Sequence, residues 1–138
     1  MSMKMIQKLS FDGCGDAAVD LYQRVFGCTV RSLIHYRDAV ANGWERACPE
    51  KDSEIYHSEL LFGDAEVRIA DSPGEEAELT RKIEHLIGMD TEAEVERAFR
   101  MLSEGGEVIM PLTRPPYMVV IGKVRDPFGV MWTLMCDF

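Results

Sequence analysis

One stretch of sequence decides the fold: Asp126-Pro127-Phe128-Gly129-Val130-Met131-Trp132-Thr133-Leu134-Met135. The Pro and Gly favour a tight turn, and the residues after them alternate between two faces, as in a β-strand. Trp132 falls on the face predicted to be core, whereas Met131, Thr133 and Met135 share the other face. A shorter version of the same pattern follows the Phe62-Gly63-Asp64 turn in mid-chain. The sequence therefore predicts one unit that is used twice.

Two amphipathic helices are predicted at matching places in the two halves. The first ends at Gly27, and the second begins at a capping box formed by Thr91 and Glu94. A shift of 77 positions maps the apolar face of the first helix onto that of the second, which pairs Ala18, Leu21, Tyr22 and Val25 with Val95, Ala98, Phe99 and Leu102. We therefore expect an α+β fold of two tandem βαβββ modules, residues 1–74 and 75–138.

The predicted strands complete this pattern of one helix and four strands in each module. In order they are residues 3–11, 28–36, 55–62 and 65–71, then 79–89, 107–112, 118–125 and 130–135. Residues 37–54 show no periodicity and include Trp44. This stretch is predicted to be a long loop, which is either a lid or a variable surface loop.

Composition excludes several classes of function. The 138 residues are 46% hydrophobic and carry a formal net charge of -9, which suits a soluble domain and disfavours nucleic acid, because phosphate binding needs clustered cations. No apolar run approaches the roughly 18 residues of a membrane span, so we expect no membrane partner and a cytoplasmic location. The four cysteines form no C-x-x-C pair, which predicts free thiols in a reducing compartment.

Four motifs together resemble a known family: Phe11-Asp12-Gly13, His57-Ser58-Glu59, residues 105–112 and residues 122–132. The chain is similar in these residues to the PhnB-like branch of the vicinal oxygen chelate superfamily, which includes glyoxalase I, bleomycin-resistance proteins and extradiol dioxygenases. The resemblance implies curved sheets with their helices outside, a cavity that the sheets enclose, and a homodimer. Because this architecture hosts enzymes and plain binders alike, it predicts the fold more firmly than the activity.

Enzymes of this superfamily commonly hold a divalent metal on four side chains, one from the first and one from the last strand of each module. The matching positions here are Ile6 or Gln7, then Arg68, Glu84 and Thr133. Only Glu84 is an ordinary metal ligand, and the fixed positive charge of Arg68 would repel a cation. We therefore expect no metal cofactor at these positions.

The cavity implied by the resemblance is expected to be lined by six side chains: Arg68, Glu84, Met131, Thr133, Met135 and Tyr117. Arg68 either pairs with Glu84 or anchors a carboxylate or phosphate of a ligand. Tyr117 and Arg114 lie in the predicted loop 113–117, where they either close over a ligand or cover the rim.

Histidines give the candidates for catalysis. His57 and Glu59 lie two residues apart on one strand and so share a face, an arrangement that suits acid–base chemistry or half of a metal site. His85 alternates onto the face predicted to pack against a helix, and we expect it to be a core residue.

The sequence favours binding of a small organic molecule without the usual metal. The alternative is a metal-dependent lyase, isomerase or oxygenase of the glyoxalase and dioxygenase kind, with a rearranged site of His57, Glu59 and Glu84. A structural dimer with a vestigial cavity is a third hypothesis. No glycine-rich nucleotide loop, G-x-S-x-G or H-E-x-x-H motif occurs in the sequence, which disfavours Rossmann-type enzymes, α/β hydrolases and zincins.

Overall fold

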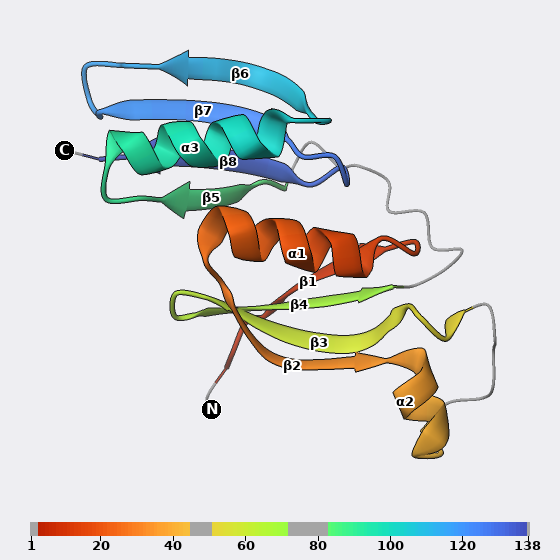
Figure 1. The fold of residues 1–138 in the computed structure, drawn as a ribbon. Helices are drawn as coiled ribbons and strands as arrows, with labels where there is room; N and C mark the ends of the chain where they lie inside the picture. Colours follow the sequence, from red (N-terminus) through yellow and green to blue (C-terminus); the bar gives the residue numbers. More distant parts are fainter. Residues whose placement is uncertain (1–2, 45–50, 72–82, 138) are drawn as a thin grey trace. The chain divides into compact units, whose positions relative to one another are not determined.

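The computed structural model describes residues 3–44, 51–71 and 83–137 (Figure 1). The chain divides into two compact units, Met1–Ala77 and Glu78–Phe138, and each is described by itself. The predicted boundary between residues 74 and 75 falls in the segment 72–82, outside the described residues.

The first unit is a four-stranded mixed sheet with one long helix and one short helix. Its elements are β1 (Gln7–Phe11), α1 (Gly15–Phe26), β2 (Thr29–His35), α2 (Tyr36–Ala41), β3 (Ile55–Phe62) and β4 (Ala65–Asp71). The strands lie in the order β1-β4-β3-β2, in which β1 runs parallel to β4 and the other pairs are antiparallel.

The second unit repeats this plan. Its elements are β5 (His85–Gly88), α3 (Glu92–Ser103), β6 (Glu107–Thr113), β7 (Val120–Arg125) and β8 (Met131–Cys136). The strand order β5-β8-β7-β6, with β5 parallel to β8, is the order of the first sheet. The predicted α+β fold of two tandem βαβββ modules is thus confirmed.

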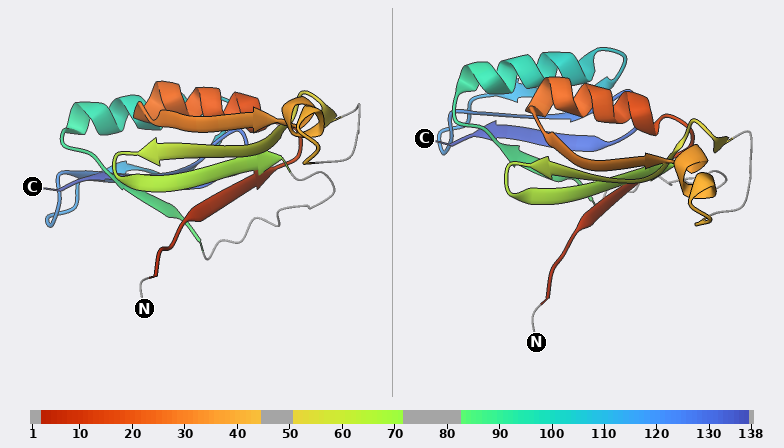
Figure 2. Two further views of the ribbon diagram at one scale, coloured as in Figure 1. Left: turned by 90° about the horizontal axis from the view of Figure 1, so that it is seen from below. Right: turned by 60° about the horizontal axis from the view of Figure 1, so that its bottom comes forward.

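Each long helix covers one face of the sheet in its own unit, α1 in the first and α3 in the second (Figures 1 and 2). Seven of the eight predicted apolar helix positions are buried, and Phe99 is half-buried. Burial of these side chains removes apolar surface from water and holds helix to sheet. The opposite face of each sheet is covered by neither long helix of its unit, and we refer to it as the helix-free face.

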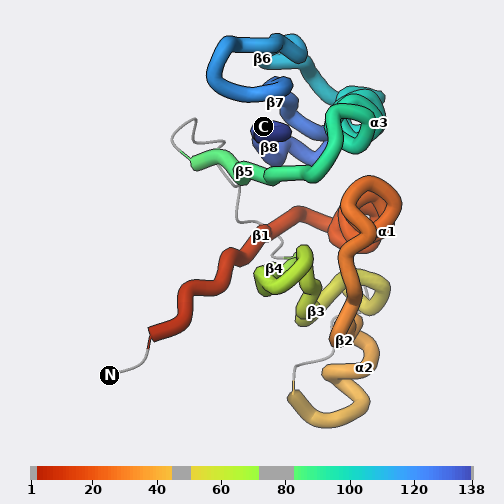
Figure 3. The backbone as a smooth tube through the Cα atoms, turned by 90° about the vertical axis from the view of Figure 1, so that its left-hand side faces the viewer, coloured from red at the N-terminus to blue at the C-terminus, as the bar shows by residue number. Residues whose placement is uncertain are grey.

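Three predicted strands differ from those observed by more than one residue at an end. β1 begins at Gln7 rather than residue 3, and the segment before it leads away from the sheet with Met5 exposed (Figure 3). β5 is confined to His85–Gly88, and residues 79–82 of its prediction lie outside the described residues. β7 begins at Val120 rather than residue 118. Apolar alternation continues past the point where strand pairing stops, so it overestimates strand length.

The predicted long loop 37–54 is partly wrong, because α2 occupies its first residues. A helix of six residues is too short to show a 3.6-residue period in the sequence. Trp44 follows α2 and is exposed, while residues 45–50 of the predicted loop lie outside the described residues.

The predicted capping box at α3 is half confirmed. The Thr91 hydroxyl oxygen accepts a hydrogen bond from the Glu94 backbone N–H, at 3.2 Å. The Glu94 carboxylate, however, accepts from the Thr91 hydroxyl at 2.9 Å rather than from the Thr91 backbone N–H. Gly27 ends α1 in the left-handed conformation with φ of 64°, as a helix-stop glycine should.

Candidate functional site

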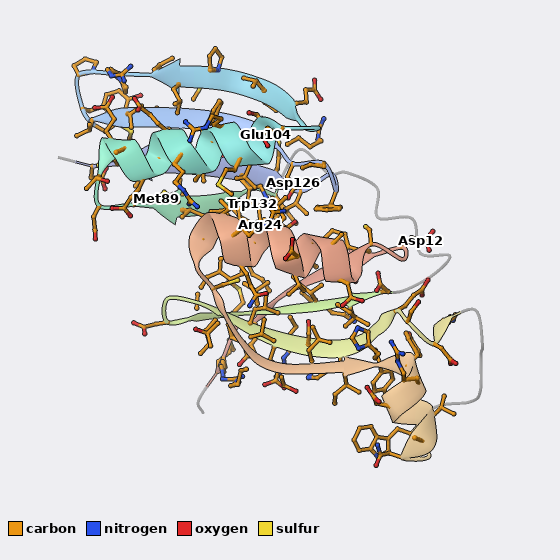
Figure 4. All side chains as sticks on the ribbon, in the orientation of Figure 1. Asp12, Arg24, Met89, Glu104, Asp126 and Trp132 are labelled. Carbon is orange, nitrogen blue, oxygen red and sulfur yellow. The ribbon has the colours of Figure 1, made fainter. Side chains whose placement is uncertain are left out.

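Asp126, the first residue of the stretch that decides the fold, is a buried hydrogen-bond hub. Its carboxylate accepts from the backbone N–H groups of Phe128 and Val130, at 2.9 and 3.0 Å, and from the Trp132 indole N–H at 2.8 Å. Figure 4 labels Asp126 and Trp132 in the second unit. Trp132 is buried as predicted. The hydrogen bonds of Asp126 therefore fix the conformation of the turn and the direction in which β8 begins.

Asp71 at the end of β4 is a buried hydrogen-bond acceptor of the first unit. Its carboxylate accepts from the backbone N–H groups of Gly13, Gly15 and Ile55, at 2.9, 3.0 and 2.8 Å. These bonds join the end of β4 to the start of α1 and the start of β3. Asp71 is 1% exposed, so its three bonds have little competition from water.

The helix-free face of the first sheet carries most of the predicted polar residues. Glu59 of β3 is paired in register with Arg68 of β4, and His57 lies two residues before Glu59 on the same face. Glu66 lies two residues before Arg68 on that face. Arg31 joins them from a β-bulge between Val30 and Ser32. Alternation did not identify Arg31, because a bulge interrupts the period of two.

Glu66 is the centre of this charged cluster. Its carboxylate accepts from Arg68 Nε at 2.7 Å, from Arg31, and from Lys4 Nζ at 3.4 Å. The Glu66 side chain is only 4% exposed. The hydrogen bonds from Arg68 and then Arg31 lower the pKa of Glu66 to about 2, from an ordinary value of 4.5. Glu66 therefore stays ionised and holds both guanidinium groups in place.

Arg68 keeps part of its guanidinium available. Its described hydrogen bond runs from Nε to Glu66, and neither Nη atom has a partner within residues 3–44, 51–71 and 83–137. The side chain is 41% exposed. Two Nη donors with a fixed orientation suit a carboxylate or phosphate, which accepts two parallel hydrogen bonds. Arg68 bonds to Glu66 within its own unit, so the structure supplies a partner other than the predicted Glu84.

His57 and Glu59 form a hydrogen-bonded pair on the same face. His57 Nε2 lies 2.8 Å from Glu59 Oε2, while Arg31 donates to Glu59 Oε1 from Nε at 3.0 Å and from Nη2 at 2.8 Å. The bonds from His57 and then Arg31 lower the pKa of Glu59. Glu59 is therefore a carboxylate that can only accept hydrogen bonds.

The helix-free face of the second sheet holds a smaller polar group. Glu84 accepts from the Thr133 hydroxyl at 2.9 Å and lies 3.1 Å from Lys123 Nζ. Lys123 and then Thr133 lower the pKa of Glu84. Lys123 is paired in register with Thr133, and the predicted wall residues Met131 and Met135 flank Thr133 on β8. The two methionines are half-buried, whereas Thr133 is 3% exposed.

Strand register tests whether the family's metal positions can hold a metal here. Gln7 is paired with the buried Val67 and Lys8 with Arg68, so Gln7 points away from the face of Arg68. Ile6, the other matching residue, precedes β1. Ile6 has no donor atom and Arg68 is a cation. In the second unit, Glu84 is the one ordinary ligand, and Lys123 and Thr133 already bind it.

A divalent metal needs at least three donors, so these positions do not fit one. Among the described residues, no group of three His, Cys, Asp or Glu side chains is arranged to hold a metal.

The remaining predicted residues make no hydrogen bond to either polar group among the described residues, and His85 is half-buried rather than fully in the core. Tyr117 is 72% exposed. Arg114 of the same loop bonds to Glu92 and Glu96 of α3, which ties the loop to that helix. His85 packs against Trp132, with ring centroids 5.1 Å apart, and burial lowers its pKa.

Two further predictions bear on the class of protein. Cys28 and Cys136 are free thiols, and Cys48 lies outside the described residues. No helix among the described residues is both long enough and apolar enough to cross a membrane.

Known structures resemble the chain along its whole length. Protein PA1353 from Pseudomonas aeruginosa is 28% identical, with a TM-score of 0.85 over 99% of this chain and 98% of that one. The PhnB protein from Bacillus cereus is 23% identical, with a TM-score of 0.83 over 98% and 100%. The fosfomycin resistance protein FosX from Mesorhizobium loti is 15% identical, with a TM-score of 0.63 over 98% and 91%. The last two similarities concern the fold alone.

Comparison with curated protein sequences gave no match. A family model, in contrast, matches residues 10–134, which include both long helices, strands β2 to β7 and the Asp126 turn. The chain therefore belongs to the Glyoxalase/Bleomycin resistance protein/Dioxygenase superfamily.

Proposed function

We propose that the chain binds a small organic anion on its helix-free sheet faces, as a homodimer and without a divalent metal. The observation that carries this proposal is the guanidinium of Arg68. Its Nε is fixed by a buried carboxylate, while its two Nη atoms have no partner among the described residues. Such a group is oriented in advance for a carboxylate or phosphate, which reduces the entropy lost on binding.

The charges around Arg68 support an anionic ligand. Lys4, Arg31 and Arg68 contribute three positive charges, against two negative charges from Glu59 and Glu66. The cluster thus carries one net positive charge when His57 is neutral, although the whole chain carries -9. A local excess of positive charge in an acidic protein attracts anions to that place.

The predicted cavity residues of the second unit are proposed as ligand contacts on the helix-free face of that unit. Met131 and Met135 offer pliable apolar surface beside Thr133 and Glu84, and Tyr117 is proposed as a rim residue. The PhnB-like assignment and the enclosed cavity are part of this proposal, since the similarity to the PhnB protein concerns the fold.

Binding of two probes tests the role of Arg68: 2-oxobutyrate for carboxylates and dihydroxyacetone phosphate for phosphates, titrated at constant ionic strength. Arg68→Ala should weaken binding by roughly 10- to 100-fold, because a charge-assisted hydrogen bond contributes about 1.5–3 kcal/mol. Arg24→Ala is the matched control, since Arg24 forms an exposed pair with Asp20 on α1 (Figure 4). Equal affinity of Arg68→Ala and wild type would remove Arg68 from the site.

The alternative function is a metal-dependent lyase, isomerase or oxygenase with a site of His57, Glu59 and Glu84. In the structure Glu59 and Glu84 are bonded to cationic side chains, and Glu59 also binds His57. Elemental analysis of protein purified without chelator separates the two functions. We expect no stoichiometric divalent metal and no thermal shift with added Zn²⁺, Mn²⁺ or Ni²⁺; a bound metal would favour the alternative.

A further inference from the structure

The His57–Glu59 pair is arranged for proton transfer. Glu59 is ionised and can only accept a hydrogen bond, so His57 Nε2 must carry the proton in the 2.8 Å contact. In the neutral imidazole the lone pair then lies on Nδ1. Nδ1 has no partner among the described residues, and the His57 side chain is 35% exposed. A carboxylate that fixes one tautomer of a histidine leaves the other nitrogen available as a base.

Arg68 lies within reach of the same small molecule. Because Glu59 is opposite Arg68 and His57 is two residues before Glu59, His57 and Arg68 are diagonal neighbours on the sheet. Diagonal neighbours have Cα atoms roughly 7–8 Å apart. Ala70 follows Arg68 by two residues on the same face, so the side chain there is small. A ligand held by the Nη atoms of Arg68 can thus present a nearby carbon to His57.

We propose that His57 is a catalytic base that exchanges a proton on carbon with a small carbonyl compound whose carboxylate or phosphate is bound by Arg68. The inference rests on the proposed function, because it requires the anion to bind at Arg68. Glu59 is a positioning residue, which fixes the tautomer and stabilises the imidazolium. The reaction requires neither a metal nor a second substrate.

The step balances within the site. The C–H bond next to the carbonyl breaks, its proton moves to His57 Nδ1, and its electron pair forms the enolate, with the negative charge on the carbonyl oxygen. The positive charge of Arg68 stabilises this oxygen. The imidazolium then returns a proton to carbon, and in heavy water the product carries deuterium.

The same unit contains a second histidine–carboxylate pair that serves as a control. His35 Nε2 lies 2.9 Å from both carboxylate oxygens of Asp16, which belongs to α1. His35 therefore resembles His57 in its hydrogen bonding but is bonded to the helix rather than to the face that carries Arg68. Exchange that depends on His57 but not on His35 identifies the arginine-bearing face as the site.

Deuterium incorporation into 2-oxobutyrate and dihydroxyacetone phosphate, followed by proton NMR in heavy water with EDTA present, tests the proposal. We expect exchange above the protein-free rate for at least one probe that binds. His57→Gln should lower this rate by at least about 100-fold, the smaller end of general-base effects, with probe affinity and thermal unfolding unchanged. His35→Gln should catalyse exchange into the probe as fast as wild type does.

A nitrogen-15 NMR measurement on His57 tests Glu59 independently of any probe. The Nε2–H tautomer should dominate in the wild type, and Glu59→Gln should increase the share of the other tautomer, because an amide can also donate. A mixed tautomer in the wild type would overturn the positioning role of Glu59.

The outcomes separate the two proposals. Binding that depends on Arg68, without exchange above the protein-free rate, would leave the binding function standing and overturn catalysis by His57. An unchanged exchange rate in His57→Gln would likewise leave the binding function standing and overturn catalysis by His57. If neither probe binds the wild type, both the proposed function and this inference fail for these ligands.

Discussion

The helix-free faces of the two sheets differ in chemistry although the two units share one strand order. Lys8 is paired with Arg68 in the first unit, and Leu86 is paired with Thr133 at the corresponding place in the second. The arginine belongs to a cluster of five charged residues and a histidine, whereas the threonine belongs to one small group with Glu84 and Lys123. The duplicated fold thus fixes the positions of the side chains, and the residue types at those positions determine the chemistry.

The two units also differ in how each uses its buried aspartate. Asp126 accepts from three donors that lie within six residues of it in the sequence. Asp71 accepts from three donors that lie 16 to 58 residues away. The first carboxylate therefore shapes a turn, while the second joins three separate elements.

Asp71→Ala should have the largest effect on stability. The substitution leaves the N–H groups of Gly13, Gly15 and Ile55 without their acceptor, two of them in buried bonds, and we expect a loss of about 3–5 kcal/mol in the free energy of unfolding. Urea denaturation followed by circular dichroism measures the change. A loss below about 1 kcal/mol would mean that water replaces the carboxylate.

Asp126→Ala should cost less, about 2–3 kcal/mol, because the N–H groups of Phe128 and Val130 lie in part-buried bonds of a turn that water can approach. Trp132→Phe is the control, since it removes the indole N–H but keeps an aromatic ring in the core. The same denaturation experiment compares all three variants. If Asp126→Ala proved more damaging than Asp71→Ala, local turn formation would contribute more than the long-range bonds.

Thr133→Val should cost about 1 kcal/mol, because it removes the hydroxyl that donates to Glu84 and leaves a side chain of similar shape. Thr133→Ser keeps the hydroxyl and serves as the control for that bond. Thermal unfolding of both variants distinguishes the effects. Equal stability of Thr133→Val and wild type would show that the polar group on the second face is not stabilising.

Acid should weaken the first unit through Glu66. Its pKa is about 2 in the folded chain, below the ordinary 4.5, so the unfolded state binds the proton first. The contribution of Glu66 to stability is therefore complete above about pH 4.5 and is lost as the pH falls toward 2. Its guanidinium partners are more than 40% exposed, so screening by water keeps the effect small.

Over this pH range, the melting temperature should change less steeply with pH in Glu66→Gln than in wild type. Glu107→Gln is the control, because Glu107 also pairs with an arginine, Arg125, but is itself mostly exposed. Identical slopes for Glu66→Gln and wild type would contradict the role of Glu66 as the centre of the cluster.

The sequence predicted those parts of the site that depend on alternation along a single strand. His57 with Glu59, and Thr133 with its flanking methionines, lie on shared faces because side chains alternate with a period of two. The partners of Arg68 were not identified, although Glu66 was placed on its face. Arg31 was not predicted, because the β-bulge at its position interrupts the alternation of side chains along β2. Arg31 is also far from Glu66 in the sequence, so no local pattern links the two residues.

The sequence by itself determined the duplicated βαβββ plan, the helix faces and the Asp126 turn, because each depends on neighbours within a few residues. Tertiary structure alone decided that Asp71 joins three distant elements and that Glu66 holds Arg31 and Arg68 in place. It also decided that Lys8 rather than Gln7 is paired with Arg68. These features depend on strand register between segments some 60 residues apart, which no local pattern of side chains specifies.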